Sequence, residues 1–151
     1  MIAVRDARFA DVAPVAAAMR RMDRLECSAF GHTPAQALEL GLIGGRETFA
    51  LTLGEEGPPV GLVGVVTIDA IAGLGKPWLL CADALMRERR SWALLGPVIM
   101  GRLQRGHRRL ENLVHRDNRP SINWLRRLGC AVGSDVQLVG GEPFVRFVRH
   151  V

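Results

Sequence analysis

The sequence predicts one mixed α/β domain, and three observations lead to this prediction. The chain has 151 residues, which is the length of a single domain. Hydrophobic residues make up 48% of it and charged residues 23%, which is typical of a chain with a packed core and excludes a disordered one. Strand-like and helix-like segments alternate, and a strand–helix–strand unit over 78–115 requires a parallel or mixed sheet. We therefore expect an α+β domain over residues 1–151, with a central mixed sheet and about four helices on its faces.

The first elements are a strand and two helices. Residues 2–5 form a strand candidate, and Asp11 then stands where a helix N-cap is expected. Apolar residues follow at helical spacing, so one helix is expected from Asp11 to about Ala29. The run Thr33–Gln36 is a capping box with proline at the first helical position, which predicts a second helix stopped by the glycines at 41, 44 and 45.

Four further strands form the predicted sheet. Residues 48–53 alternate between apolar and polar, whereas 60–68 are almost wholly apolar. The pair reads as an antiparallel hairpin whose second strand is central and covered on both faces. Buried strands are also expected at 78–82 and 110–115, and we expect these two to lie parallel to each other.

The second half of the chain supplies two more helices. One is expected from about Arg89 to Arg105, with a kink or a restart at Gly96-Pro97. Asn118 is expected to cap the other, which closes at Leu128-Gly129. Two last strands are expected near 131–139 and 144–148.

Nothing in the sequence indicates a membrane or secreted protein. No apolar run reaches the roughly 18 residues that a membrane span needs, and the N-terminus has no signal-peptide pattern. We therefore expect a soluble, cytoplasmic protein. Cys27, Cys81 and Cys130 are widely spaced and lack any Cys/His ligand pattern, so we expect neither disulfides nor a metal site.

Positive charge is concentrated in one region. The net charge is +5, and nineteen of the twenty basic residues are arginine. Between Arg87 and Arg127, eleven arginines stand against three acidic residues, so the rest of the chain is net acidic. Such a patch suggests an anionic partner: a phosphorylated cofactor, a nucleic acid or an acidic protein face. A solvated helix surface is the alternative explanation.

The stretch 110–130 carries the most specific pattern. A strand ends in valine, an asparagine follows, and a short helix closes on a leucine-glycine pair, here Val114, Asn118, Leu128 and Gly129. This resembles the second half of the GNAT acyltransferase fold, and the element order is similar over essentially the whole chain. Within that superfamily, three segments look like a small branch encoded by tailed phages and prophages: ECSAFG at 26–31, PWLLCADAL at 77–85, and RLENLVHRDN followed by SINWLRRLG.

The resemblance implies acetyl-CoA, or another acyl-CoA, in a cleft where the strands at 78–82 and 110–115 splay apart. The pantetheine arm would pair with the backbone around 84–86, and the pyrophosphate would sit at the N-terminus of the next helix, where free N–H groups bind anions. The cofactor-binding residues so implied are Ala84, Leu85, Met86, Arg89, Arg90, Ser91, Trp92, Asn118 and Ser121.

The sequence departs from the family in two ways. The stretch 86–93 has no glycine to let the backbone wrap a pyrophosphate, although Arg89 and Arg90 offer charged forks and Ser91 stands at a plausible helix cap. Many members also carry a tyrosine seven residues after the asparagine, as the acid that protonates the leaving thiolate. Leu125 occupies that position, and the chain contains no tyrosine.

Acyl transfer to an amine needs a base, and three residues are candidates. Asp83 follows the strand at 78–82, where burial beside the thioester would make its carboxylate more basic. His115 ends the neighbouring strand, and Glu26 lies late in the first helix, on the acceptor side of the cleft. Each also has an ordinary structural explanation, and Cys27 has no recognisable partner that would make it a nucleophile.

Three functions remain open. The first is an acyl-CoA-dependent N-acetyltransferase that transfers directly to an unknown amine acceptor. The second is a phage or prophage particle or assembly protein that retains the fold with weak or no catalysis and has phage structural proteins as its partners. The third, a nucleic-acid-binding module, ranks last because we expect no exposed aromatic residues among the arginines and find no recognised binding motif. The sequence indicates no oligomeric state.

Overall fold

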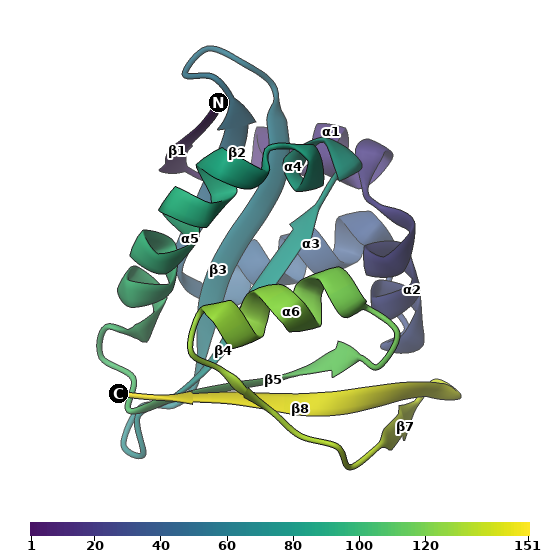
Figure 1. Cartoon of the computed structure of the whole chain (residues 1–151). Helices are drawn as coiled ribbons and strands as arrows, with labels where there is room; N and C mark the ends of the chain where they lie inside the picture. The colour runs from purple at the N-terminus through teal and green to yellow at the C-terminus, as the bar shows by residue number, and fades with distance from the viewer.

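One sheet forms the centre of the molecule, with helices packed on both of its faces (Figure 1). The computed structural model describes residues 1–151. α4, α5 and α6 cover one face and α1, α2 and α3 the other. The predicted mixed α/β class is confirmed, with six α-helices and one short 3₁₀ helix rather than about four helices. The helices are η1 (Phe9–Asp11), α1 (Val12–Ala18), α2 (Arg21–Ala29), α3 (Pro34–Gly44), α4 (Asp83–Arg87), α5 (Arg89–Gln104) and α6 (Arg119–Arg127).

The sheet is mixed, and only one pair of neighbouring strands is parallel. Its order is β1-β2-β3-β4-β5-β8-β6, and β7 pairs with β8 at the other end of that strand. β4 and β5 run parallel, whereas every other pair is antiparallel. The strands are β1 (Ile2–Asp6), β2 (Gly45–Leu53), β3 (Pro59–Asp69), β4 (Leu74–Cys81), β5 (Arg109–His115), β6 (Ala131–Val132), β7 (Gln137–Val139) and β8 (Glu142–His150).

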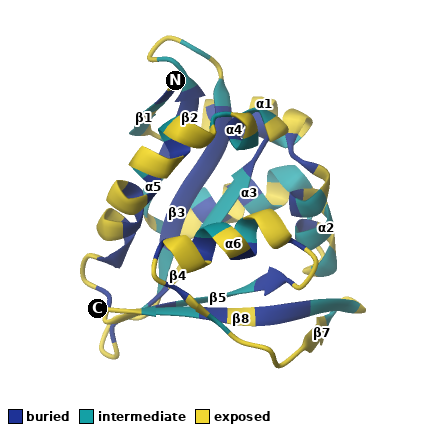
Figure 2. Cartoon of the chain, viewed as in Figure 1, coloured by how far each residue is buried: buried dark blue, intermediate teal, exposed yellow.

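β3 is the central strand, as predicted. It pairs with β2 on one side and β4 on the other, and residues 60–65 are all buried (Figure 2). Val63 and Val65 belong to the larger hydrophobic cluster, which includes residues of α4, α5 and α6, whereas Leu62 belongs to a smaller cluster with residues of α1, α2 and α3. Because side chains alternate across a strand, β3 contributes to the core on both faces of the sheet.

The helix expected from Asp11 to Ala29 is interrupted. α1 ends at Ala18, and Met19 is extended, with φ −56° and ψ 134°. The Arg20 backbone N–H donates to the carbonyl of Cys81 at 2.9 Å, and Met19 bridges to Ala82. Backbone bonds to the end of β4 therefore replace helical ones at this point, although the apolar spacing of the sequence continues through it.

Asp11 precedes α1 as predicted but does not cap it with its side chain. Instead, the Asp11 carboxylate accepts from both terminal nitrogens of Arg5 and from the backbone N–H of Arg8. The capping box of α3 is confirmed: Thr33 Oγ1 accepts from the Gln36 backbone and Gln36 Oε1 from the Thr33 backbone.

α5 runs unbroken through Pro97, so the expected restart at Gly96-Pro97 is wrong. Gly96 instead allows a close helix contact, because a Cβ there would lie 2.9 Å from the ring of Trp124 on α6. The strand expected at 131–139 is also wrong as one element, since β6 and β7 pair with different parts of β8. None of the helices combines the length and the apolar character needed to cross a membrane.

β4 and β5 are parallel neighbours over a short distance only. Pairing is confined to Leu74 with Arg109 and Gly75 with Leu110. Beyond it the strands diverge, and the side-chain amide of Asn112 donates to the Pro77 carbonyl at 2.8 Å. β4 and β5 are therefore parallel, as predicted. The two segments predicted as strands, 78–82 and 110–115, lie largely in the part where β4 and β5 have separated.

Candidate functional site

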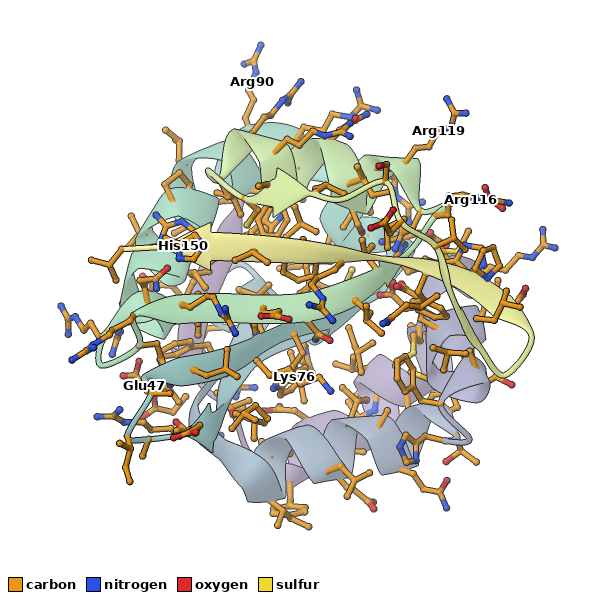
Figure 3. The ribbon with its side chains drawn as sticks, turned by 90° about the horizontal axis from the view of Figure 1, so that it is seen from below. Glu47, Lys76, Arg90, Arg116, Arg119 and His150 are labelled. Atoms are coloured by element: carbon orange, nitrogen blue, oxygen red, sulfur yellow. The ribbon has the colours of Figure 1, made fainter.

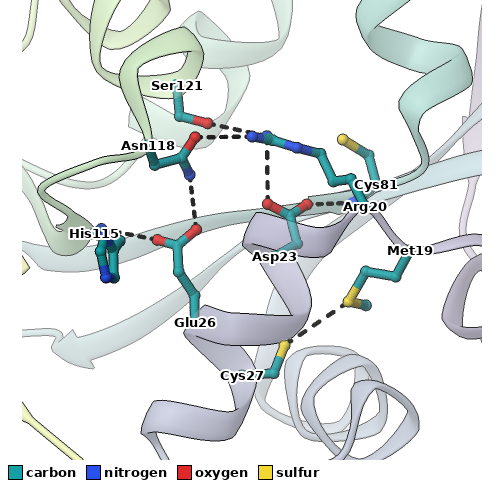
Figure 4. Close-up of polar contacts among 9 residues, drawn as sticks. All are labelled: Met19, Arg20, Asp23, Glu26, Cys27, Cys81, His115, Asn118 and Ser121. Atoms are coloured by element: carbon teal, nitrogen blue, oxygen red, sulfur yellow. Dashed lines mark hydrogen bonds and ion pairs between the residues drawn. The ribbon is translucent and has the colours of Figure 1, made fainter. Parts of the chain in front are cut away.

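A cavity opens where β4 and β5 separate. Its volume is about 430 Å³, and its walls are mainly hydrophobic. On the sheet side, the cavity is lined by Trp78 and Leu80 of β4 and by Val114 of β5. On the other side it is lined by Trp124 and Leu125 of α6, the helix that spans the opening. One part of the wall is polar, where α2 faces the start of α6 (Figure 4), and its members are Arg20, Asp23, Glu26, Asn118 and Ser121.

Arg20 is the centre of this polar wall. It is only 7% exposed, and its guanidinium reaches three side chains. Nη2 donates to Asn118 Oδ1 at 2.8 Å, and Nη1 lies 3.2 Å from Ser121 Oγ and 3.3 Å from Asp23 Oδ1. Arg20 therefore joins the start of α2 to the start of α6 across the cleft.

Glu26 makes a second connection across the cleft. Its Oε1 accepts from Asn118 Nδ2 at 2.8 Å, and its Oε2 accepts from the backbone N–H of His115 at 3.0 Å. The side-chain amide of Asn118 is thus fully engaged, with its oxygen on Arg20 and its nitrogen on Glu26. The carboxylate of Glu26 is held at the cavity wall by donors from two elements of the C-terminal half.

Both carboxyl groups of this wall are more basic than usual. Burial raises the pKa of Glu26 from 4.5 to about 7, and the neighbouring Asp23 carboxylate raises it as well. Burial also raises the pKa of Asp23 from 3.8 to about 6, against the attraction of Arg20 and the hydrogen bond from the Cys81 backbone. A carboxylate whose pKa is near neutrality can both take and return a proton at physiological pH.

The local sequence of α2 explains this arrangement. Arg20, Asp23 and Glu26 are three residues apart, so they lie along one face of the helix. The interruption at Met19 starts α2 afresh and directs that face toward β5 and α6. Sequence analysis found Glu26 but missed Arg20 and Asp23, because a run of charges on a helix normally faces water. The three-residue spacing was the signal that could have found them.

His115 is near the site, but its ring is not part of the cavity wall. The ring is buried against Phe144, with centroids 5.4 Å apart, and Nδ1 accepts from the Asp117 backbone N–H. Nε2 has no hydrogen-bond partner and lies 3.8 Å from a carboxylate oxygen of Glu142, facing a separate hollow. The contribution of His115 to the site is its backbone N–H, which holds Glu26.

Asp83 does not meet the condition that made it a candidate base. It begins α4, its side chain is exposed, and it does not line the cavity. The cysteines are also poor nucleophiles, since burial raises the pKa of the Cys27 and Cys130 thiols to about 11 and that of Cys81 well above its usual value. The thiolate is the reactive form, and it is scarce at neutral pH.

The region expected to hold phosphates differs from expectation. Residues 84–86 lie in α4, so they offer no extended edge to a pantetheine arm, and Leu85 is fully buried in the core. Glu88 is the N-cap residue of α5, and its carboxylate lies 3.2 Å from the N-terminal amine. Ser91 therefore lies within the first turn of α5 and is not its cap.

The arginines and the tryptophan of this region have separate roles. Arg89 and Arg90 are exposed without an ion pair, and Arg90 points away from the molecule (Figure 3). Trp92 is buried and stacks on Trp124 of α6, with ring centroids 4.5 Å apart. Arg89, Arg90 and Trp92 do not line the cavity.

Asn118 and Ser121 do line the cavity, as the resemblance implied. Asn118 is 1% exposed and is the N-cap residue of α6, as predicted, but its side chain makes no capping hydrogen bond. Its amide is used across the cleft instead. Sequence analysis did not identify Trp78, Phe30 or Lys76, which also line the cavity, because each looks like an ordinary core or surface residue.

The cavity suits one part of an acyl-CoA better than the other. Beyond Gly75, one edge of β4 has no strand partner, and such an edge can pair with the amides of a pantetheine arm. The surrounding apolar walls suit an acyl chain. Where the phosphates of the coenzyme are expected, residues 86–93 contain no glycine, and the arginines there, including Arg89 and Arg90, are exposed.

No protein-family model matches the sequence, and no curated protein is significantly similar to it. The similarity to solved structures is extensive. The phosphinothricin acetyltransferase from Sinorhizobium meliloti, of the GNAT superfamily and in complex with acetyl-CoA, is 16% identical with a TM-score of 0.68, covering 99% of this chain and 88% of its own. Ard1 from Thermoplasma volcanium is 15% identical with a TM-score of 0.71, covering 99% and 97%.

A third similar structure is AAC(6')-Ib in complex with ribostamycin and coenzyme A. It is 13% identical with a TM-score of 0.69, and the match covers 99% of this chain and 93% of that one. All three matches extend over almost the whole chain at low identity. The separated β4 and β5 are where the resemblance placed the cleft of this fold. The chain therefore has the acyl-CoA N-acyltransferase fold of the GNAT acetyltransferases.

Proposed function

We propose that this protein is an acyl-CoA-dependent N-acyltransferase in which Glu26 is the general base. The observation that carries the proposal is the Glu26 carboxylate, held at the wall of the cleft with a pKa of about 7. The fold and the coenzyme complexes of the similar structures AAC(6')-Ib and phosphinothricin acetyltransferase support acyl-CoA as the donor.

The cleft residues can perform the acceptor half of the reaction. At neutral pH an amine is protonated to an ammonium ion, which the carboxylates of Asp23 and Glu26 attract. Glu26 takes a proton from the ammonium ion, which leaves a nitrogen lone pair free to attack. When bound, an acyl-CoA thioester supplies an acyl carbon that gains a bond to this nitrogen and loses its bond to sulfur. The nitrogen is positively charged once this bond has formed, and it releases its second proton to water to give the neutral amide. Arg20 and Asn118 keep Glu26 in position through their shared contacts.

The site has no tyrosine at the position where the resemblance implies an acid that protonates the leaving sulfur. Leu125 lines the cavity near Trp124, and neither carries an acidic proton at neutral pH. A thiol has an ordinary pKa of about 8.5, so a thiolate can leave and take its proton from water. We therefore expect slow turnover, because one positioned acid or base contributes about 10²–10⁴-fold to a rate.

The test is release of free thiol from acetyl-CoA over a panel of primary amines. With Glu26 as the base, kcat/KM rises with pH through about 7, since the carboxylate must be ionised. Glu26→Gln should lower kcat/KM by about 10²–10⁴-fold and remove this pH dependence. The pKa of the neighbouring Asp23 is also raised, to about 6, so Asp23→Asn serves to separate the titration of Asp23 from that of Glu26.

Glu39→Gln is the matched control, because Glu39 is exposed on α3 and does not line the cavity. It should leave both kcat/KM and the pH profile unchanged. An unaltered rate and profile in Glu26→Gln would reject Glu26 as the base. Absence of thiol release with every amine would reject the enzyme proposal.

A second candidate function is a phage particle or assembly protein that keeps the fold without catalysis. The helix α4 at residues 84–86 and the lack of a glycine cradle favour this alternative. Under it, no amine of the panel would release thiol from acetyl-CoA, even if acetyl-CoA at millimolar concentration binds the native state and raises the melting temperature.

A further inference from the structure

The mouth of the cavity on the α2–α3 side is apolar and exposed. Phe30 of the α2–α3 turn is 42% exposed, Leu40 of α3 is 51% exposed and Ile68 of β3 is 56% exposed, and all three line the cavity. Large apolar side chains that stay exposed beside a cavity usually mark a site where an apolar group binds. We call these three residues the apolar rim.

The walls below the rim continue this character. Val66 of β3 and Trp78 of β4 also line the cavity and are half-buried, and Phe144 of β8 packs edge-on against Phe30 with ring centroids 5.3 Å apart. The path from the rim to Glu26 is therefore bordered largely by hydrocarbon. Water bound along such walls is readily displaced by an apolar ligand.

Charge within the cavity is arranged by depth. The two carboxylates, Asp23 and Glu26, lie at the inner polar wall beside Arg20. Lys76 lies on the α3 side of the sheet and its Nζ is 6.0 Å from the Phe30 ring centroid (Figure 3). One cation can be accommodated at the inner carboxylates, whereas a second cation near the rim would meet the positive charge of Lys76.

From this arrangement we infer that the acceptor is a small monoamine with an apolar body. Its ammonium group would lie at Glu26 and its hydrocarbon part between the apolar rim and Trp78. The same charges disfavour polyamines, which carry several ammonium groups along their length. This inference rests on the proposed function, because it assigns the acceptor class of the same cavity.

The experiment measures amine binding by calorimetry in the absence of any acyl donor. The probes are 2-phenylethylamine, ethylamine and spermidine. We expect 2-phenylethylamine to bind at least about tenfold more tightly than either of the others, because its ring leaves water for the apolar walls. Equal or tighter binding of spermidine, or equal binding of ethylamine, would overturn the inference.

Two matched variants test whether the rim makes the difference. Leu40→Glu places a carboxylate at the rim and should weaken 2-phenylethylamine binding about tenfold while improving spermidine binding. Leu94→Glu is the control, because Leu94 is 77% exposed on α5 and does not line the cavity. Equal effects of the two variants would overturn the assignment of the rim.

Thiol release from acetyl-CoA with the same three amines separates this inference from the proposed function. Preferential turnover of 2-phenylethylamine supports both. Preferential binding without turnover rejects acyl transfer but still supports the ligand class. Turnover with no preference for the apolar amine supports acyl transfer and rejects the ligand class.

Discussion

Arginine occurs in two contrasting settings in this protein. Arg20 lies in the net-acidic part of the chain, is 7% exposed, and contacts Asn118, Ser121 and Asp23. Arg89 and Arg90 lie in the arginine-rich part, are exposed on α5, and make no ion pair. The concentration of positive charge in the sequence therefore pointed to a surface, whereas a single buried arginine organises the cavity wall.

This comparison shows that the structural role of an arginine depends more on its burial and its neighbours than on how many arginines the segment contains. At the surface, water and salt screen each arginine, so it holds little structure in place. In the cleft, burial strengthens each polar contact and makes any unpaired partner costly. The following predictions test how far this contrast extends.

The largest effect is expected from Arg20→Met. Removing the guanidinium leaves Asp23 buried without its ion-pair partner and Asn118 Oδ1 without its donor. At pH 8, where Asp23 is ionised, the free energy of unfolding should fall by about 3–5 kcal/mol, measured by urea denaturation. Arg89→Met is the matched control and should change it by less than about 0.5 kcal/mol. Similar losses in the two variants would remove the contrast on which the comparison rests.

A smaller effect is expected in the pH dependence of stability. The pKa of Glu26 is about 7 in the native protein against 4.5 ordinarily, and that of Asp23 is about 6 against 3.8. Between about pH 4 and 7 the native state therefore keeps protons that the unfolded chain has lost. Raising the pH through this window lowers the free energy of unfolding, by about 1–3 kcal/mol for Glu26 from the linkage relation.

The contribution of Glu26 to this pH dependence is isolated by comparing the stability of the Glu26→Gln variant with that of the unsubstituted protein. Glu26→Gln cannot titrate at position 26, so its stability should fall less steeply than that of the unsubstituted protein across the same pH range. Denaturation curves at intervals from pH 4 to 8 measure the difference. Glu39→Gln should reproduce the slope of the unsubstituted protein. A difference curve that stays flat would mean that the Glu26 carboxyl has the same proton affinity in both states.

The smallest effect is expected for the exposed arginines of α5. Arg89→Met combined with Arg90→Met should weaken acetyl-CoA binding less than about thirtyfold, because solvent-exposed charges contribute about 1 kcal/mol or less each. The loss should shrink further in 0.5 M salt, where screening removes surface attraction. Calorimetry at two salt concentrations measures both quantities. A hundredfold loss that persists in high salt would show that these side chains form a specific phosphate site.

The sequence by itself determined most of the local structure. The capping box at Thr33, the hairpin of β2 and β3 and the central position of β3 all follow from patterns of neighbouring residues, and the structure has each of them. Glu26 could be named as a candidate because the family resemblance places this helix on the acceptor side of the cleft. These features depend on residues only a few positions apart.

Only the tertiary structure decided what surrounds the site. Arg20 and Asn118 are 98 residues apart in sequence, yet their hydrogen bond joins α2 to the start of α6. The helix break at Met19 exists because the end of β4 supplies backbone partners. The side chain of Asn118 makes no capping hydrogen bond because it is bonded to Arg20 and Glu26 instead. Local patterns record which face of an element is apolar, but the partners of a buried polar group are set by packing of distant segments.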